Sequence, residues 1–131
     1  MASHRILVIE DEPGAREALE SLLVEEGYTV ATAASGQSGL ERLRDFRPDT
    51  VVCDFRLPDT DGLEILRHVR SEDGTVTFIV VTAGCGGEDA ERLVRSEADF
   101  FFQKPVDLGR LRTVLQQSAP GAEPAWARAH H

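Results

Sequence analysis

The sequence is poor in lysine: among its fourteen strongly basic residues, only Lys104 is a lysine and the others are arginine. A lysine ammonium is a compact charge on a slim stem, whereas the arginine guanidinium is a planar fork suited to paired hydrogen bonds. Lys104 follows the apolar run Phe100-Phe101-Phe102 and precedes Pro105. Either a small cation is needed at this position, or the single lysine lies there by chance. The residue alone does not decide between the two.

Cysteine is also scarce, and long apolar runs are missing. The two cysteines show no framework spacing, which argues against a disulfide scaffold. Cys53 lies in an apolar run and is expected in the core, whereas Cys85 in a glycine-rich loop is expected to be more accessible. No stretch approaches the roughly 18 apolar residues of a membrane span, and the N-terminus lacks a signal-peptide pattern. A cytoplasmic location is therefore the default expectation, with no membrane partner.

Positive charge is outnumbered by negative charge, and the formal net charge is -9. This balance argues against nucleic-acid binding through a basic face, because neutralising phosphates requires clustered Lys and Arg. Metal or cationic partners are more natural for such a chain. The four histidines show no metal-ligand spacing. With 131 residues, the chain has room for one domain with a proper core but not for a second full domain.

Hydrophobic periodicity predicts strands and helices in regular alternation. The expected strands are residues 5–9, 28–33, 50–53, 77–81 and 100–102, and the expected helices are residues 15–26, 35–46, 62–69, 88–96 and 107–117. Five such units predict an α/β fold, a doubly wound parallel sheet with five helices on its two faces. Their length suits the flavodoxin-like strand order 2-1-3-4-5, in which ligands bind beyond the carboxyl ends of the strands.

Acidic side chains stand at two of these strand ends. Glu10-Asp11-Glu12 follows the first strand and Asp54 follows the third, so the fold would bring these carboxylates to one edge. Ionised carboxylates in such a cluster need a cation, and a small set of oxygen ligands suits Mg²⁺. The alternative is a solvated charge run that favours the next helix N-terminus, which is the only role expected for Glu12.

The fourth and fifth strands bring two further polar side chains to the same edge. Thr82 follows the fourth strand and Lys104 follows the fifth. Separately, Thr82 could cap a turn and Lys104 could be an ordinary surface charge. Together with Glu10, Asp11 and Asp54, they indicate a Mg²⁺ site that handles a phosphoryl group, because a cation and an ammonium both stabilise phosphoryl charge.

At this point the sequence resembles the receiver domain of two-component response regulators over about residues 5 to 117. The match rests on the acidic pair after Ile6-Leu7-Val8-Ile9, the aspartate of Val51-Val52-Cys53-Asp54, and the segments Leu57-Pro58-Asp59-Thr60-Asp61-Gly62, Val81-Thr82-Ala83 and Lys104-Pro105. The resemblance implies a signalling phosphoacceptor and not an enzyme. It also implies residues 1–117 as the receiver domain and 118–131 as a flexible tail or truncated linker.

The resemblance assigns roles residue by residue. Asp54 would accept a phosphoryl group from a histidine kinase or a phosphotransfer protein. Asp11 and Asp54 would ligate Mg²⁺ directly with the backbone carbonyl of Arg56, and Glu10 would hold a metal-bound water. Thr82 and Lys104 would bind phosphoryl oxygens.

The resemblance also implies a switch. Thr82 would be drawn toward the phosphorylated aspartate, and Phe101 would turn inward to fill the vacated space. The face made by the fourth helix, the fifth strand and the fifth helix would then bind a partner protein, an output domain or a second copy of the chain. Glu97 stands where the family usually has glycine, and Gly84 leaves an open approach to Asp54.

Three other functions remain as alternatives. A Mg²⁺-dependent aspartyl phosphohydrolase would use Asp54 as its nucleophile, although such enzymes usually carry a second acid two residues later, where this chain has Arg56. A receiver-like interaction module that is never phosphorylated would not need the intact acidic residues, Thr82 and Lys104. A flavin-binding domain would need a hydroxyl- and glycine-rich phosphate loop where this chain has Glu12-Pro13-Gly14.

Overall fold

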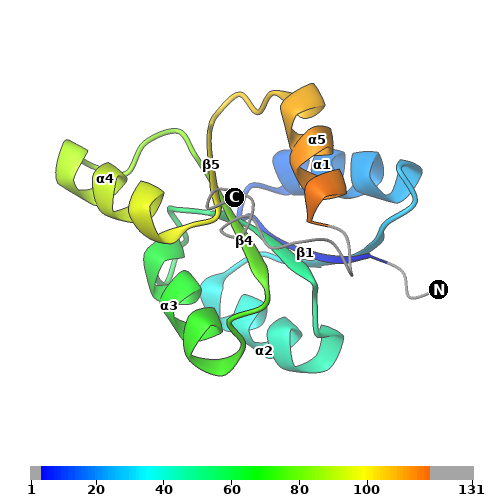
Figure 1. Cartoon of the computed structure of the whole chain (residues 1–131), viewed down its shortest axis with the longest axis horizontal. Coiled ribbons are helices and arrows are strands. Elements are labelled where there is room, and N and C mark those ends of the chain that lie inside the picture. Colours follow the sequence, from blue (N-terminus) through cyan, green and yellow to red (C-terminus); the bar gives the residue numbers. More distant parts are fainter. Residues whose placement is uncertain (1–3, 119–131) are drawn as a thin grey trace, which may run out of the picture.

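A computed structural model of the chain describes residues 4–118, in which five strands alternate with five helices (Figure 1). The strands are β1 (Arg5–Ile9), β2 (Thr29–Ala33), β3 (Thr50–Asp54), β4 (Thr77–Thr82) and β5 (Phe100–Gln103). The helices are α1 (Pro13–Glu25), α2 (Gly36–Phe46), α3 (Gly62–Glu72), α4 (Glu88–Glu97) and α5 (Leu108–Gln117). Of the expected tail, residues 118–131, only Ser118 is described, and it caps the end of α5; the rest lies outside the described residues. Among residues 4–118, no helix is both long and apolar enough to cross a membrane.

All neighbouring strands pair in parallel, in the order β2-β1-β3-β4-β5, which confirms the flavodoxin-like α/β fold. Alternate residues of each central strand enter two separate apolar cores, because successive side chains point to opposite faces of a sheet. Leu7 and Ile9 pack on the face covered by α2, α3 and α4. Ile6 and Val8 pack on the face covered by α1 and α5, which lie together on one side of the sheet in Figure 1. Burial on both faces explains why these strands read as continuous apolar runs.

Several observed elements are longer than the expected ones, for local reasons. Helix α1 begins at Pro13 and not at residue 15, because the Glu12 carboxylate accepts hydrogen bonds from the backbone N–H groups of Gly14 and Ala15. These two hydrogen bonds lower the pKa of Glu12, and the bond from Ala15 contributes most. Strands β3, β4 and β5 each run one residue further, to Asp54, Thr82 and Gln103. The polar ends of the strands are thus fixed in the sheet ladder.

The loop after β3 is tied down close to Asp54. The Asp59 carboxylate accepts hydrogen bonds from Gly36 N and Gln37 N at the start of α2, at 2.8 and 2.9 Å. Asp61 caps α3 by accepting from Glu64 N at 3.0 Å. Directly after Asp61 the chain passes so near the end of β3 that a Cβ at Gly62 would lie 3.1 Å from the Asp54 carbonyl oxygen. A larger residue at this position would therefore require the backbone at the end of β3 to shift by a few tenths of an ångström.

A buried histidine lies at the opposite end of the sheet. His4 is 7% exposed, its Nε2 is 2.8 Å from Thr50 Oγ1, and its ring meets the Tyr28 ring edge-on. Its Nδ1 is buried and has no hydrogen-bond partner among the described residues. Burial lowers the pKa of His4, with an opposing contribution from Asp49. The fold therefore favours the neutral imidazole.

This burial predicts acid sensitivity. Because the unfolded chain binds a proton on His4 more readily than the folded chain, the free energy of unfolding should fall as pH drops below about 6.5, the unperturbed histidine value. The contribution is fully present above that pH. Urea unfolding from pH 7.5 to 5.0 should show this slope in the parent protein and a smaller slope in His4→Gln. The same slope in both proteins would contradict the assignment, and His68→Gln, on the solvent-accessible side of α3, is the matched control.

Candidate functional site

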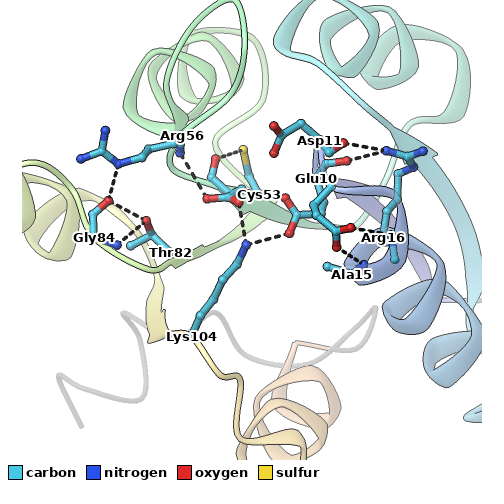
Figure 2. A network of polar contacts seen from close by, with 12 residues as sticks. Glu10, Asp11, Ala15, Arg16, Cys53, Arg56, Thr82, Gly84 and Lys104 are labelled. Atoms are coloured by element: carbon cyan, nitrogen blue, oxygen red, sulfur yellow. Dashed lines mark hydrogen bonds and ion pairs between the residues drawn. The ribbon is translucent and has the colours of Figure 1, made fainter.

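The carboxyl ends of four strands deliver the predicted polar residues to one place. Asp54 and Thr82 are the last residues of β3 and β4, and Glu10 and Lys104 directly follow β1 and β5. Because all strands are parallel, these ends meet at the same edge of the sheet. Figure 2 shows Lys104 reaching from one segment of the chain toward Glu10 on another, with Asp11 next to Glu10.

The predicted acidic cluster is present. Glu10, Asp11 and Asp54 each offer a carboxylate oxygen, and these oxygens lie within 4.8 Å of one another. Glu10 and Asp54 are only 6% and 8% exposed, whereas Asp11 faces solvent. Negative charges this close repel one another, and burial strengthens the repulsion because little water screens it.

Lys104 is the cation that faces this cluster. Its Nζ donates to Glu10 Oε1 at 2.7 Å and to Asp54 Oδ2 at 2.8 Å. Burial acts to lower the pKa of Lys104, but the hydrogen bonds to Asp54 and Glu10 outweigh it, so the net shift is upward. Burial and the nearby Asp54 carboxylate raise the pKa of Glu10, although Lys104 opposes this shift. The lysine remains charged and partly neutralises two buried acids.

One oxygen of the cluster is left without a partner. Glu10 Oε2 is buried and accepts no hydrogen bond among the described residues. An unpaired buried carboxylate oxygen is costly, and one ammonium does not neutralise three carboxylates. Oxygen ligands of this kind suit Mg²⁺, which accepts a few carboxylates and retains several waters. The donor set therefore fits a magnesium ion.

Thr82 lies at the predicted edge but is engaged elsewhere. Its hydroxyl donates to Gly84 O at 2.9 Å and accepts from Gly84 N at 3.0 Å. Phe101 is 7% exposed, with the Arg95 guanidinium from α4 lying 4.1 Å from its ring centroid. The structure thus brings Glu10, Asp11, Asp54 and Lys104 together, whereas the Thr82 hydroxyl bonds to the following loop.

The side-chain contacts of two arginines at the site were not predicted from the sequence. Arg16 Nη1 donates to the carbonyl oxygens of Glu10 and Asp11, at 3.0 and 3.4 Å, and so fixes the turn after β1. Arg56 Nε donates to Gly84 O at 3.0 Å, across the loop that follows β4. Neither contact has a sequence signal, because a long arginine reaches several equally plausible acceptors.

Three further residues near the site, Cys53, Cys85 and Glu97, were singled out from the sequence. Cys53 is fully buried, as expected, and this burial is the main cause that raises the pKa of its thiol well above the usual range. Cys85 is half-buried, and burial also raises its thiol pKa. Glu97 ends α4 without a left-handed residue after it, and its carboxylate pairs with Arg67 at 2.9 Å.

An apolar groove leads to the acidic cluster. It has a volume of about 560 Å³ and lies between α1 and the segment that joins β5 to α5. Leu19, Leu22, Val106 and Leu108 line its sides, and Asp54 and Lys104 stand in its wall. Leu108 is 48% exposed, so the groove leaves apolar surface open beside the charged site.

Comparison with known proteins gives a consistent result. The family model for the response regulator receiver domain matches residues 6–116. The chain is 41% identical over 116 residues to the transcriptional regulatory protein AfsQ1 of Streptomyces coelicolor, covering 86% of this chain and 51% of that protein. It is 32% identical over 117 residues to the regulatory protein AtoC of Escherichia coli, covering 89% of this chain and 25% of that protein. The chain thus spans about half of the one relative and a quarter of the other.

Solved structures agree with this match. The response regulator TrrA of Thermotoga maritima, solved in complex with Mg²⁺ and BeF, is 31% identical with a TM-score of 0.78, over 87% of this chain and 97% of that one. A CheY-like receiver domain of Methanospirillum hungatei is 26% identical with a TM-score of 0.78, over 89% and 97%. Since the family model spans nearly the whole described fold, the chain belongs to the response regulator receiver domains of two-component systems.

Proposed function

We propose that this domain is a phosphorylation-dependent switch whose Asp54 accepts a phosphoryl group from a histidine kinase or phosphotransfer protein. The observation that carries the proposal is the pairing of a buried Asp54 carboxylate with Lys104, beside Glu10 and Asp11, at the edge where parallel sheets bind ligands. Receiver domains of response regulators are signalling domains and not enzymes in the usual sense. Because this chain belongs to that family, a switch is favoured over a phosphohydrolase.

The proposed transfer needs little from the protein beyond position and charge. A carboxylate oxygen of Asp54 attacks the phosphorus of a phosphohistidine, the new O–P bond forms as the N–P bond breaks, and the histidine nitrogen leaves with its electron pair and takes a proton from water. The Lys104 ammonium and the Thr82 hydroxyl would then bind phosphoryl oxygens. Positioned cations and donors of this kind supply most of the stabilisation in phosphoryl transfer.

Mg²⁺ is the proposed cofactor. Asp11 and Asp54 would hold it together with the backbone carbonyl of Arg56, and Glu10 would hold one of its waters. When bound, the ion neutralises the charge of the carboxylates and of the phosphoryl oxygens. Two observations on the described part of the chain support this assignment: Glu10 Oε2 has no hydrogen-bond partner there, and the three carboxylates lie close together.

The groove supports a protein as the phosphodonor. A donor that reaches Asp54 passes between α1 and residues 105–108, where apolar side chains such as Leu22 and Leu108 are available for contact. Burying apolar surface of this kind is the usual core of a protein interface. A helix bearing a phosphohistidine beside small apolar residues fits these requirements.

The proposed output is the face made by α4, β5 and α5. Phe101 and its covering Arg95 lie on this face, one strand away from Thr82. Movement of Thr82 toward a phosphorylated Asp54 would let Phe101 and α4 adjust and change what the face binds. The partner is an output domain, another protein or a second copy of the chain. Residues 1–117 are the proposed receiver unit, with 118–131 as its tail or linker.

Magnesium should stabilise the fold. A ligand that binds only the folded state contributes RT ln(1 + [L]/Kd), or about 2.7 kcal/mol at a hundredfold excess over Kd. We therefore expect the midpoint of thermal unfolding to rise with Mg²⁺ in the parent and to respond far less in Asp11→Asn. Asp45→Asn, which changes an exposed aspartate of α2, is the control. An equal rise in all three proteins would indicate general ion effects instead of this site.

Phosphoryl uptake is the direct test of the function. The protein is incubated with acetyl phosphate and Mg²⁺ and then examined by intact mass spectrometry. One added phosphoryl group, lost on treatment with hydroxylamine, is expected for an acyl phosphate. If the parent protein gains no phosphoryl group and binds no beryllofluoride, the proposal is wrong.

A further inference from the structure

Arg56 contacts both ends of the proposed switch. Its backbone N–H donates to Asp54 Oδ1 at 3.2 Å, and its side-chain Nε donates to Gly84 O at 3.0 Å. One residue therefore joins the carboxylate that would be phosphorylated to the loop after β4. Figure 2 shows the Arg56 side chain extended to Gly84, next to Thr82.

Gly84 in turn holds the Thr82 hydroxyl at two points. The Gly84 carbonyl accepts from Thr82 Oγ1, and the Gly84 N–H donates to the same oxygen. Because the hydroxyl has a single hydrogen, its donation to the Gly84 carbonyl must break before it can donate to a phosphoryl group on Asp54. The carbonyl that Arg56 contacts is thus the one that keeps Thr82 in its present position.

The 83–87 loop needs such a support. It contains Gly84, Gly86 and Gly87, and glycine loses more backbone freedom on ordering than any other residue. Gly86 has a φ of +87°, and a Cβ there would lie 3.2 Å from Arg56 Nη2, so the loop packs directly against the guanidinium. Two separate contacts from one side chain therefore restrain a loop of low intrinsic order.

We propose that Arg56 is a positioning residue that keeps the 83–87 loop, and through Gly84 the Thr82 hydroxyl, in the unphosphorylated arrangement. This inference rests on the proposed function only in naming Thr82 as the group that moves. The loop then has two states, one in which Gly84 holds the hydroxyl and one in which the hydroxyl is free. A ligand that needs the second state binds more weakly in proportion to the population of the first.

Amide exchange measures the first state without any ligand. The Gly84 N–H is protected only while it donates to Thr82, so Arg56→Met should speed its hydrogen exchange by roughly 3- to 10-fold, the effect of losing one hydrogen bond. The Lys104 N–H, which donates to the Thr82 carbonyl at 2.9 Å, should not change and serves as the internal reference. Arg5→Met is the matched control, because Arg5 Nε also donates to a backbone carbonyl, that of Phe46, at 2.9 Å. Unchanged Gly84 exchange in Arg56→Met would overturn the proposal.

A double-mutant cycle separates this positioning role from charge. Removing the guanidinium also removes a cation near a site for anions, which by itself would weaken binding of beryllofluoride in the presence of Mg²⁺. Thr82→Val has no hydroxyl for Gly84 to hold, so only the charge effect of Arg56→Met should remain in that background. The effect of Arg56→Met is the ratio of beryllofluoride affinity after the substitution to that before it. We expect this ratio to be at least about threefold higher in the Thr82 background than in the Thr82→Val background. Equal effects in both backgrounds would show that Arg56 acts by charge alone.

The two measurements also separate this inference from the proposed function. If the parent protein bound no beryllofluoride, the phosphoacceptor role of Asp54 would be wrong, yet Gly84 exchange would still report whether Arg56 orders the loop. If the parent bound beryllofluoride but Gly84 exchange were unchanged in Arg56→Met, the function would stand and the positioning role would be wrong. Thr82→Ser, which retains the hydroxyl, should keep the coupling with Arg56.

Discussion

Asp54→Ala should take up no phosphoryl group from acetyl phosphate and Mg²⁺, a loss of more than about 100-fold against the parent protein. The substitution removes the proposed acceptor oxygen. Asp54 is the member of the cluster that lies at the end of β3, where it pairs with Lys104. Asp11 faces solvent and Glu10 follows a different strand, so neither occupies the same position. Uptake is measured by intact mass spectrometry over a time course.

The fold should survive this substitution. Lys104 retains its hydrogen bond to Glu10, and one of the mutually repelling carboxylates is removed. Circular dichroism and the midpoint of thermal unfolding verify that the variant is folded. Asp45→Ala makes the same chemical change on the exposed side of α2 and should take up phosphoryl groups like the parent. Full uptake by Asp54→Ala, mapped to another aspartate, would refute Asp54 as the acceptor.

Lys104→Met should slow phosphoryl uptake by roughly 100-fold, the usual effect of removing one donor that faces developing negative charge. The Nζ atom lies 2.7 Å from Glu10 and 2.8 Å from Asp54, so its loss also leaves two buried carboxylates without their cation. We expect the variant to be less stable than the parent without Mg²⁺, and Mg²⁺ to narrow this difference, because the ion can neutralise the two carboxylates. Initial rates with acetyl phosphate, at saturating Mg²⁺, give the effect on uptake itself.

Lys104→Arg distinguishes charge from shape. It keeps a cation, so uptake should be disturbed less than in Lys104→Met, but a planar guanidinium does not fit between two carboxylates as a compact ammonium does. The response of the face formed by α4, β5 and α5 should therefore suffer more than uptake. Beryllofluoride-induced NMR shifts around Phe101 report that response. Arg112→Met, which removes an exposed ion pair with Glu26 at 2.8 Å, is the control, and a wild-type response in Lys104→Arg would show that charge alone suffices.

The order of elements was accessible from the sequence because its signals are local. Apolar runs such as residues 5–9 indicate strands buried on both faces, and Gly27 and Pro48 mark where helices have ended. Boundaries were less accurate where a side chain acts at a distance of a few residues. Glu12 was expected only to favour the helix electrostatically, yet its hydrogen bonds to backbone N–H groups start α1 two residues early.

The acidic site was accessible for a related reason. In a parallel sheet, topology alone brings the carboxyl ends of strands together, so residues such as Glu10, Asp54 and Lys104 can be placed at one edge without coordinates. Lys104 pairs with both Glu10 and Asp54, so the small cation considered for this position lies beside the acids gathered at the same edge. Sequence order and strand direction carry this information.

Other features required the tertiary structure. A hydroxyl or guanidinium can bond to several acceptors, and the choice depends on distances of a few tenths of an ångström that no residue pattern records. Only the structure shows that the Thr82 hydroxyl bonds to Gly84, that the Arg56 side chain crosses the 83–87 loop, and that Glu10 Oε2 has no partner within residues 4–118. It also reveals the apolar groove, whose walls come from α1 and residues 105–108. The sequence by itself thus determined the fold, the edge of the sheet and the charges gathered there, because these follow from local periodicity and strand direction. The tertiary structure decided which atoms bond to one another, because hydrogen bonding is short-ranged and directional.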